Sequence, residues 1–462
     1  MIQDYIKRKI KNGEWPAGSN LPSQRELAST LGVNRSTIIA ALDELKAQGL
    51  IEGKMGSSTK VVQNLWQQLT NSTPHWNDFV QWSLHPPNDP IVRKINQTEI
   101  DRGFIHLSKG ELGSDLYPRK ELSQTFKKVG ENISYYGYGD GKGSLSLRRA
   151  LSHHLASRGV LADPESILIV SGSLQALQLI SLGVLQSEST VFLEKPSYLY
   201  STHVFRSMGM KLKGIPVNDK GLDTAYFRRQ SIVKNKSIVY TNPTFHNPTG
   251  NTMPLERRKE LLRVCEEYQL PLIEDDIYRD LWLEEEPPST LKSLDTQGHV
   301  LYTGSFSKTI DPGLRIGWMV GPEKVIGRLA DIRMQIDYGT SMVSQAVAEY
   351  MLTSGLYELH LQQTRKELLK KRNYLIQLLN RYFQDDAYWE VPKGGFFILV
   401  HFKHPINTKH LFSESFKKKV LINPTSIYQD ITSQSIRLSF AYPTYKQMQQ
   451  GIEILKGIIE SR

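Results

Sequence analysis

Short apolar segments alternate with longer amphipathic ones over most of the chain. Five runs have the length and apolar content of buried strands, and they lie at 166–170, 190–194, 237–241, 271–274 and 299–304. Between them, segments such as 254–269 place apolar residues at the spacing of one helix face. Buried strands that alternate with helices are typical of a largely parallel sheet covered by helices on both faces. This pattern predicts an α/β body.

The two ends of the chain follow other patterns. Strand-like segments at 394–402 and 435–442 precede a final amphipathic helix, which indicates a smaller α+β lobe. Residues 63–104 are rich in Gln, Asn, Pro and Trp, and we expect them to be a linker. The expected domains are an N-terminal domain at 1–62 and a body at 105–462, with its large domain at about 130–335 and its small lobe at about 105–129 and 340–462.

Residues 1–62, here called the reader, have the pattern of a helix-turn-helix followed by a hairpin. Ser23 can cap the first helix, and Glu26 three residues later completes a capping box. Gly32 suits the tight turn, and Asn34 can cap a second helix. The apolar face of that helix has i, i+3, i+4, i+7 spacing and consists of Ile38, Ala41, Leu42 and Leu45. Two short strands around a Gly/Ser-rich tip then predict a wing.

Composition and charge narrow the function classes. The 462 residues are 39% hydrophobic and 23% charged, which is ordinary for a globular protein. No stretch approaches the roughly 18 apolar residues of a membrane span, and we expect no signal peptide at the basic start. The single Cys265 cannot form an internal disulfide, which fits the cytoplasm. The formal charge of +10 gives little support to nucleic-acid binding, since residues 1–62 hold only +3 of it.

Four separated motifs of the body suit the chemistry of pyridoxal phosphate. They are Asn247-Pro-Thr-Gly, Asp275-Asp-Ile-Tyr278, Ser-Phe-Ser-Lys308 and the strand-like segment that carries Arg437. Lys308, flanked by small residues, can form an imine with the cofactor aldehyde. Asp275 can keep the pyridine nitrogen protonated, so that the ring acts as an electron sink. Asn247 and Tyr278 can donate hydrogen bonds to the phenolic oxygen of the cofactor.

Further residues suit the cofactor phosphate, its ring and a bound carboxylate. Donors for the phosphate are Ser173 at a helix start, Ser305, Ser307 and Arg315. Tyr198, which follows a strand, can stack on the ring. Arg437 can clamp the carboxylate of a substrate or effector in a bidentate manner, and Asn247 is a second candidate contact for that ligand. No metal site is predicted.

The body motifs resemble the fold-type I enzymes of the aspartate aminotransferase superfamily over roughly residues 105–462. The forms Asp-Asp-x-Tyr and Gly-Ser-Phe-Ser-Lys are similar to those of the kynurenine/α-aminoadipate aminotransferase-like branch. This resemblance implies a homodimer in which Tyr136 reaches the phosphate of the partner's site.

The reader resembles the GntR family of winged-helix regulators. Its second helix presents Arg35, Ser36 and Thr37 at the N-terminal end, where a recognition helix meets DNA. The resemblance implies that Arg25, Arg35 and Thr37 contact DNA and that a wing around Gly56 lies along the minor groove.

A GntR-type reader joined to an aminotransferase-like body resembles the MocR subfamily over the whole chain. The resemblance implies a transcription regulator that binds double-stranded DNA, forms a head-to-tail homodimer and senses an amino-acid-like effector through the imine on Lys308. Two alternatives stay open. One is an active aminotransferase with a secondary autoregulatory reader, because the catalytic candidates Lys308, Asp275 and Tyr278 are all present. The other is a sensor of pyridoxal phosphate itself, for which the carboxylate clamp of Arg437 has no evident use.

Overall fold

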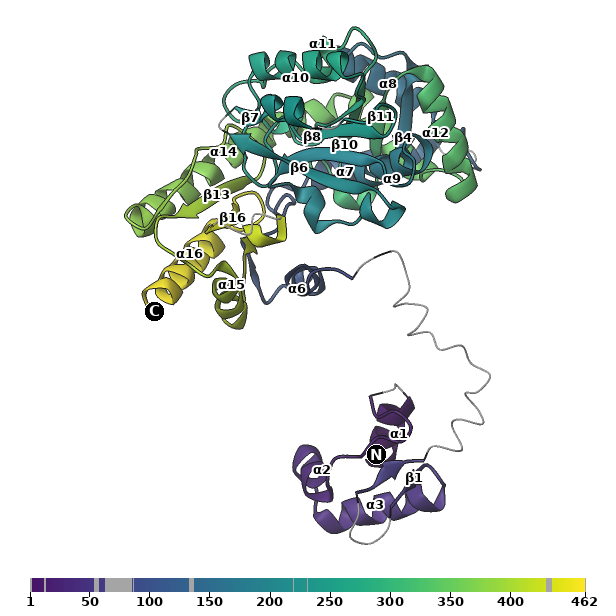
Figure 1. The fold of residues 1–462 in the computed structure, drawn as a ribbon, viewed down its shortest axis with the longest axis vertical. Coiled ribbons are helices and arrows are strands. Elements are labelled where there is room, and N and C mark those ends of the chain that lie inside the picture. Colours follow the sequence, from purple (N-terminus) through teal and green to yellow (C-terminus); the bar gives the residue numbers. More distant parts are fainter. Residues whose placement is uncertain are drawn as a thin grey trace. The chain divides into compact units, whose positions relative to one another are not determined.

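The computed structural model describes residues 2–11, 14–53, 58–62, 85, 87–132, 137–218, 220–230, 232–428 and 434–461. The chain divides into two compact units, Met1–Ser83 and Leu84–Arg462 (Figure 1). None of the helices in the described ranges combines the length and the apolar character that crossing a membrane requires.

The first unit contains a helix-turn-helix and a short antiparallel hairpin. Its elements are α1 (Ile2–Lys11), α2 (Gln24–Leu31), α3 (Arg35–Ala47), β1 (Ile51–Glu52) and β2 (Lys60–Val61). The predicted capping box is confirmed, since the Glu26 amide donates to Ser23 Oγ at 3.2 Å and the Ser23 amide donates to Glu26 Oε2 at 2.9 Å. The predicted apolar face of α3 is buried.

One detail of the predicted turn is wrong. Asn34 occupies the N-cap position of α3 with extended backbone, but its side chain makes no capping hydrogen bond. The amides of Thr37 and Ile38 instead donate to the backbone oxygen of Asn34, at 3.0 and 3.3 Å. The backbone carbonyl of Asn34 therefore satisfies the Thr37 amide, which is one of the donors that a side-chain cap would take.

An eight-stranded sheet forms the centre of the second unit (Figure 1). Its strands, in spatial order, are β4 (Ile167–Val170), β11 (Gly317–Val320), β10 (Val300–Ser305), β9 (Leu272–Asp275), β8 (Ser237–Thr241), β5 (Thr190–Lys195), β6 (Lys211–Asn218) and β7 (Gly221–Leu222). The five strands from β10 to β6 pair in parallel, and β4, β11 and β7 pair antiparallel. The predicted, largely parallel sheet is confirmed.

Helices cover both faces of this sheet because alternate strand residues face opposite ways. On one face, α9 (Ser173–Gly183) and α12 (Glu323–Ile336) share a core with Leu168 and Leu301. On the other face, α10 (Leu255–Glu267) and α11 (Leu291–Leu294) pack over Val300. Other helices form a separate core with Tyr302 of β10, namely α7 (Arg119–Asn132), α8 (Leu145–Ala156) and α13 (Met342–Thr353).

The small lobe is built on a four-stranded antiparallel sheet. In spatial order its strands are β12 (Ala387–Tyr388), β13 (Phe397–Phe402), β16 (Ser435–Ser439) and β15 (Asn423–Pro424). The helices α14 (Leu356–Phe383), α15 (Thr408–Lys417) and α16 (Tyr445–Glu460) pack with it, and β14 (Val420–Leu421) pairs in parallel with β3 (Ile105–His106). Short 3₁₀ helices lie at Pro164–Ser166, Tyr198–Ser201, Arg206–Met208, Thr224–Arg229, Arg279–Leu281, Pro312–Leu314 and Thr425–Tyr428.

Helix α6 (Pro90–Thr98) lies within the range predicted as a linker, and it belongs to the second unit. Asp89 caps it by accepting from the Ile91 amide at 2.8 Å. Its apolar face is buried in the core of the body through Val92 and Ile95.

Candidate cofactor and effector site

A cavity of about 320 Å³ opens at the carboxyl ends of β4, β5, β8, β9 and β10, the edge of a parallel sheet at which ligands bind. Nine residues predicted to bind cofactor or effector line it, namely Ser173, Tyr198, Asn247, Asp275, Tyr278, Ser307, Lys308, Arg315 and Arg437. Ser305 does not line it, and Tyr136 lies outside the described residues.

The carboxylate of Asp275, at the end of β9, is buried with half of its hydrogen-bonding capacity unused. Its Oδ2 accepts from the hydroxyl of Tyr240 at 2.6 Å, while Oδ1 has no hydrogen-bond partner in the described structure. Burial raises the pKa of Asp275 to about 6, and the hydrogen bond from Tyr240 opposes the rise. A buried acceptor without a partner is costly, and a cationic donor in the cavity removes that cost.

Asn242 ties the strand ends around Asp275 together. Its Nδ2 donates to the backbone oxygen of Asp275 at 2.7 Å, and its Oδ1 accepts from the Asn247 amide at 2.9 Å. The backbone oxygen of Asn247 in turn accepts from the Tyr198 amide at 3.1 Å. The ends of β5, β8 and β9 are therefore held in one hydrogen-bonded frame.

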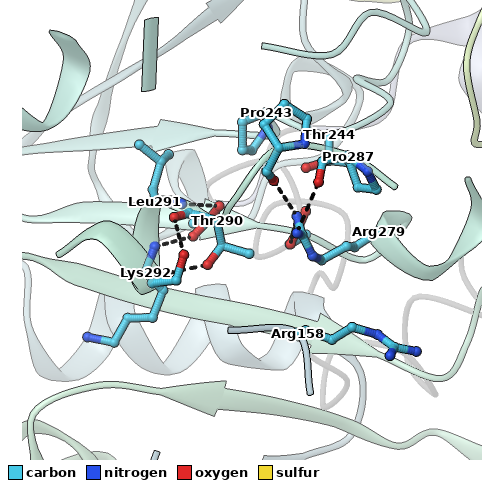
Figure 2. A network of polar contacts seen from close by, with 12 residues as sticks. Arg158, Pro243, Thr244, Arg279, Pro287, Thr290, Leu291 and Lys292 are labelled. Carbon is cyan, nitrogen blue, oxygen red and sulfur yellow. Dashed lines mark hydrogen bonds and ion pairs between the residues drawn. The ribbon is translucent and has the colours of Figure 1, made fainter. Parts of the chain in front are cut away.

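A buried network behind this frame fixes β9 (Figure 2). The Glu274 carboxylate accepts from the amides of Leu291 and Lys292, both at 2.8 Å, at the start of α11. Arg258 donates to the Pro243 oxygen at 3.0 Å, and its guanidinium lies 3.5 Å from Glu274. These contacts leave little freedom to the strand that carries Asp275.

Lys308 follows β10 in a turn anchored by the buried Phe306. The Phe306 ring packs 4.8 Å from that of Trp318, and its amide donates to the Ile316 oxygen at 3.0 Å. The Lys308 ammonium donates to the Gly110 oxygen at 2.7 Å. Burial lowers the pKa of Lys308, which favours the neutral amine that acts as a nucleophile.

Donors also gather where α9 begins. The Arg315 side chain donates to the Ser171 oxygen at 2.5 Å and is exposed. Gly172 is the N-cap of α9 with φ +90°, and a Cβ there would lie 2.5 Å from Arg315 Nη2. The Ser305 hydroxyl donates to Ser307 Oγ at 3.0 Å, so Ser305 supports Ser307 from behind the cavity wall. A helix N-terminus beside an arginine and a serine is suited to a phosphate.

Arg437, on β16, is held in place by two hydrogen bonds, and its Nε remains without a partner among the described residues. Its Nη1 donates to Asn247 Oδ1 and its Nη2 to the Ser108 oxygen, both at 2.6 Å, and Nε has no partner in the described structure. The guanidinium carbon lies 3.8 Å from the ring centre of Phe397. This buried cation is fixed in orientation, and no carboxylate of the described residues forms an ion pair with it, which suits an anionic ligand.

Aromatic side chains form much of the remaining wall. Burial raises the pKa of both Tyr198 and Tyr278, so both hydroxyls stay protonated donors. Sequence reasoning missed Tyr240, Asn242 and Tyr428, which also line the cavity. Two of them had a usable signal, because Tyr240 and Asn242 stand at the end of a predicted strand next to the Asn-Pro-Thr-Gly motif.

The residues of the cavity fit pyridoxal phosphate. The unpartnered Oδ1 of Asp275 suits a protonated ring nitrogen, Lys308 suits the aldehyde, and the donors at the start of α9 suit the phosphate. The described part of the chain contains no cluster of His, Cys, Asp or Glu placed to hold a metal ion.

The predicted DNA contacts of the reader lie on one exposed region around the start of α3. Arg25, Arg35, Ser36 and Thr37 are all exposed. Arg35 donates through Nε and Nη2 to Gln24 Oε1 at 3.2 and 3.1 Å, which links α3 to α2. Gly56 lies outside the described residues.

Comparison with known proteins finds a matching family for each of the two parts of the chain. Residues 102–455 match the family of class I and II aminotransferases, and residues 1–61 match the bacterial regulatory proteins of the gntR family. The chain is 49% identical over 452 residues to the HTH-type transcriptional regulator YdfD of Bacillus subtilis strain 168, which covers 98% of this chain and 94% of YdfD. It is 39% identical over 435 residues to the HTH-type transcriptional regulator NorG of Staphylococcus aureus strain USA300, covering 94% of this chain and 97% of NorG.

Among solved structures, the kynurenine aminotransferase of Pyrococcus horikoshii, in complex with PMP, is similar to this chain. It has a TM-score of 0.76 and 29% sequence identity, and the match covers 86% of this chain and 99% of that one. The chain therefore belongs to the aminotransferase class I and II family, and its gntR-type N-terminal part gives it the two-part architecture of the MocR-type regulators.

Proposed function

We propose that this protein is a DNA-binding transcription regulator that depends on pyridoxal phosphate and responds to an amino-acid-like effector. The observation that carries the proposal is one cavity that brings together Lys308, the unpartnered Oδ1 of Asp275 and the unpartnered Nε of Arg437. The same chain carries a gntR-type reader. A reader alone explains DNA binding, but it gives no reason to retain a cavity with these three groups.

The proposal gives each cavity residue a role. When bound, pyridoxal phosphate supplies an aldehyde for a lysine amine and an electron-withdrawing ring. Lys308 holds the aldehyde end, Asp275 the ring nitrogen, and Tyr198 the ring face. Asn247 and Tyr278 hold the phenolic oxygen, and Arg437 holds the carboxylate of the effector. The phosphate is held by Ser173, Ser307 and Arg315, with Ser305 in support.

The wider arrangement is also part of the proposal. The reader spans residues 1–62 and the body begins near 105. Two chains form a head-to-tail homodimer in the cytoplasm, and Tyr136 of each chain serves the site of its partner. Arg25, Arg35, Ser36, Thr37 and the wing around Gly56 contact the DNA.

The test is a mobility-shift titration of the full chain on DNA from the promoter of its own gene. It is carried out with and without pyridoxal phosphate, and then with a panel of amino acids. We expect the cofactor to give a visible absorbance band, and one class of amino acid to change both this band and the DNA affinity. If Lys308→Ala removes the band yet leaves the response of DNA binding to amino acids unchanged, the proposal fails.

An active aminotransferase is a second candidate, because Lys308, Asp275 and Tyr278 line one cavity beside the carboxylate clamp of Arg437. The two functions differ in turnover. Sustained release of 2-oxo acid from the amino acid that alters the absorbance would favour the aminotransferase function over the regulatory one. A response of DNA binding to pyridoxal phosphate alone, with no effect of any amino acid, would instead indicate a sensor of the cofactor.

A further inference from the structure

One wall of the cavity carries two carboxylates that the proposed cofactor chemistry does not use. Glu99 directly follows α6, and Glu111 lies in the loop after β3; both line the cavity. Glu111 pairs with Lys109 at 3.1 Å, and Lys109 also donates to the backbone oxygen of Glu99 at 3.3 Å. The Glu99 carboxylate has no ion pair or hydrogen bond within the described ranges.

Charge at this wall is out of balance once the cofactor is in place. Glu99 and Glu111 carry two negative charges against the single positive charge of Lys109. Lys308 lines the same cavity and interacts electrostatically with both carboxylates, but it is the group that the cofactor aldehyde occupies. Burial and the neighbouring Glu111 raise the pKa of Glu99, while Lys109 and Lys308 oppose the rise. One further positive charge is needed to complete the wall.

The opposite requirement holds on the β16 side of the same cavity. Arg437 is 5% exposed and its buried Nε has no partner, so an anionic group of a ligand would stabilise it. A ligand that satisfies both sides carries a carboxylate for Arg437 and a cation for Glu99 and Glu111, besides the amino group that reaches Lys308.

We propose, building on the proposed function, that the effector is an amino acid with a positively charged side chain, and that Glu99 and Glu111 select it. L-Lysine and L-ornithine represent this class. Amino acids with neutral or acidic side chains leave the charge of the wall uncompensated or add to it.

The test compares side chains of equal length in the protein loaded with pyridoxal phosphate. The change in visible absorbance is titrated with L-lysine, with L-norleucine, which lacks only the terminal ammonium group, and with L-glutamate. We expect half-saturation by L-lysine at a concentration about tenfold or more below that of L-norleucine, with L-glutamate weakest. Equal or tighter binding of L-norleucine or L-glutamate, or no binding of any of the three, overturns the inference.

Variants then locate the selectivity. Glu99→Gln and Glu111→Gln keep the side-chain shape, and each is expected to remove most of the preference for L-lysine over L-norleucine. Glu367→Gln, which removes an exposed carboxylate paired with Lys370 on α14, is the matched control and should keep the preference. Retention of the preference in both cavity variants, or its loss in the control, overturns the assignment to Glu99 and Glu111.

This outcome is independent of the regulatory proposal. If L-lysine binds selectively but DNA affinity does not respond to it, the proposed function fails and the selectivity stands. If DNA affinity responds only to neutral or acidic amino acids, the selectivity fails and the proposed function stands.

Discussion

Asp275 is a costly residue for the body to bury, because its carboxylate receives one hydrogen bond from Tyr240 and leaves Oδ1 without a partner. A ligand that donates a hydrogen bond to Oδ1 removes this cost. Asp275→Asn keeps the shape and removes the charge. We expect the affinity for pyridoxal phosphate to fall by about ten- to a hundredfold, the range for a lost charge-assisted hydrogen bond. Equilibrium titration of the visible absorbance measures this fall, and unchanged affinity would exclude Asp275 as the partner of the ring nitrogen.

The same residue makes the stability of the cofactor-free protein depend on pH. The pKa of Asp275 is raised from 3.8 to about 6 by burial, so its carboxyl group binds a proton more tightly in the folded chain than in the unfolded chain. Its stabilising contribution is then full below pH 3.8 and is lost as the pH rises through 6. We expect wild type to lose roughly 3 kcal/mol more than Asp275→Asn between pH 4 and 7. Urea unfolding of both proteins across this range gives the difference, and parallel curves would contradict it.

On the reader, Arg35 stands where a recognition helix meets DNA, and it is exposed. Arg35→Ala should weaken binding to the operator by about ten- to a hundredfold. Lys46→Ala is the matched control, because it removes the same charge from the last turn of α3. Mobility shifts of both variants decide the matter. An equal loss in the two would show that only net charge matters.

At the scale of elements, the start of α9 depends on a residue without a side chain. Gly172 has φ +90°, and a Cβ there would lie 2.5 Å from Arg315 Nη2. Gly172→Ala should displace Arg315 and lower the affinity for pyridoxal phosphate at least about tenfold, as measured by absorbance titration. Gly130→Ala, in α7, meets nothing within 4 Å and should leave the affinity unchanged. A similar affinity in the two variants would mean that the phosphate is held elsewhere.

Elements with an unbroken apolar pattern were predictable from the sequence, and others were not. The segment 237–241 is β8 as predicted, because every residue of it is buried. Strand β6 was missed, since its Lys, Gly and Pro residues alternate with apolar ones and it is only partly buried. Strand β11 was missed because it begins with glycine, which leaves an apolar run of only three residues.

The cavity residues also divide into those that could be predicted from the sequence and those that could not. Lys308, Asp275 and Asn247 stand in local motifs, which the sequence displays. Tyr428 lines the cavity without any motif around it, because the lobe brings it there through tertiary packing. Helix α6 was placed in a linker on its polar composition, although two apolar side chains, Val92 and Ile95, are enough to bury one face of a short helix.

At the scale of the whole molecule, α6 contributes to the cavity wall and also lies on the side of the body from which the chain continues, in sequence, to the reader. Val92 and Ile95 line the cavity, and within the described residues α6 is the helix that follows the reader's α3 and hairpin in the chain. A ligand in the cavity therefore touches the segment through which the reader is attached. A ligand shifts an equilibrium between two conformations only through contacts that differ between them. Contacts between the ligand and α6 differ in this way if α6 moves when the ligand binds.

Truncation of Ile95 tests this coupling. Ile95→Ala should leave DNA affinity without ligand unchanged and reduce the change of that affinity on adding pyridoxal phosphate and L-lysine, measured by mobility shift. Ile458→Ala is the matched control: Ile458 is also buried, lies in α16, and does not line the cavity. Each truncation should cost about 2–5 kcal/mol of stability, so a loss of response in Ile95→Ala alone cannot come from stability. An equal response in the two variants would mean that the signal leaves the cavity by another route, and hydrogen exchange of α6 with and without ligand would then show no added protection.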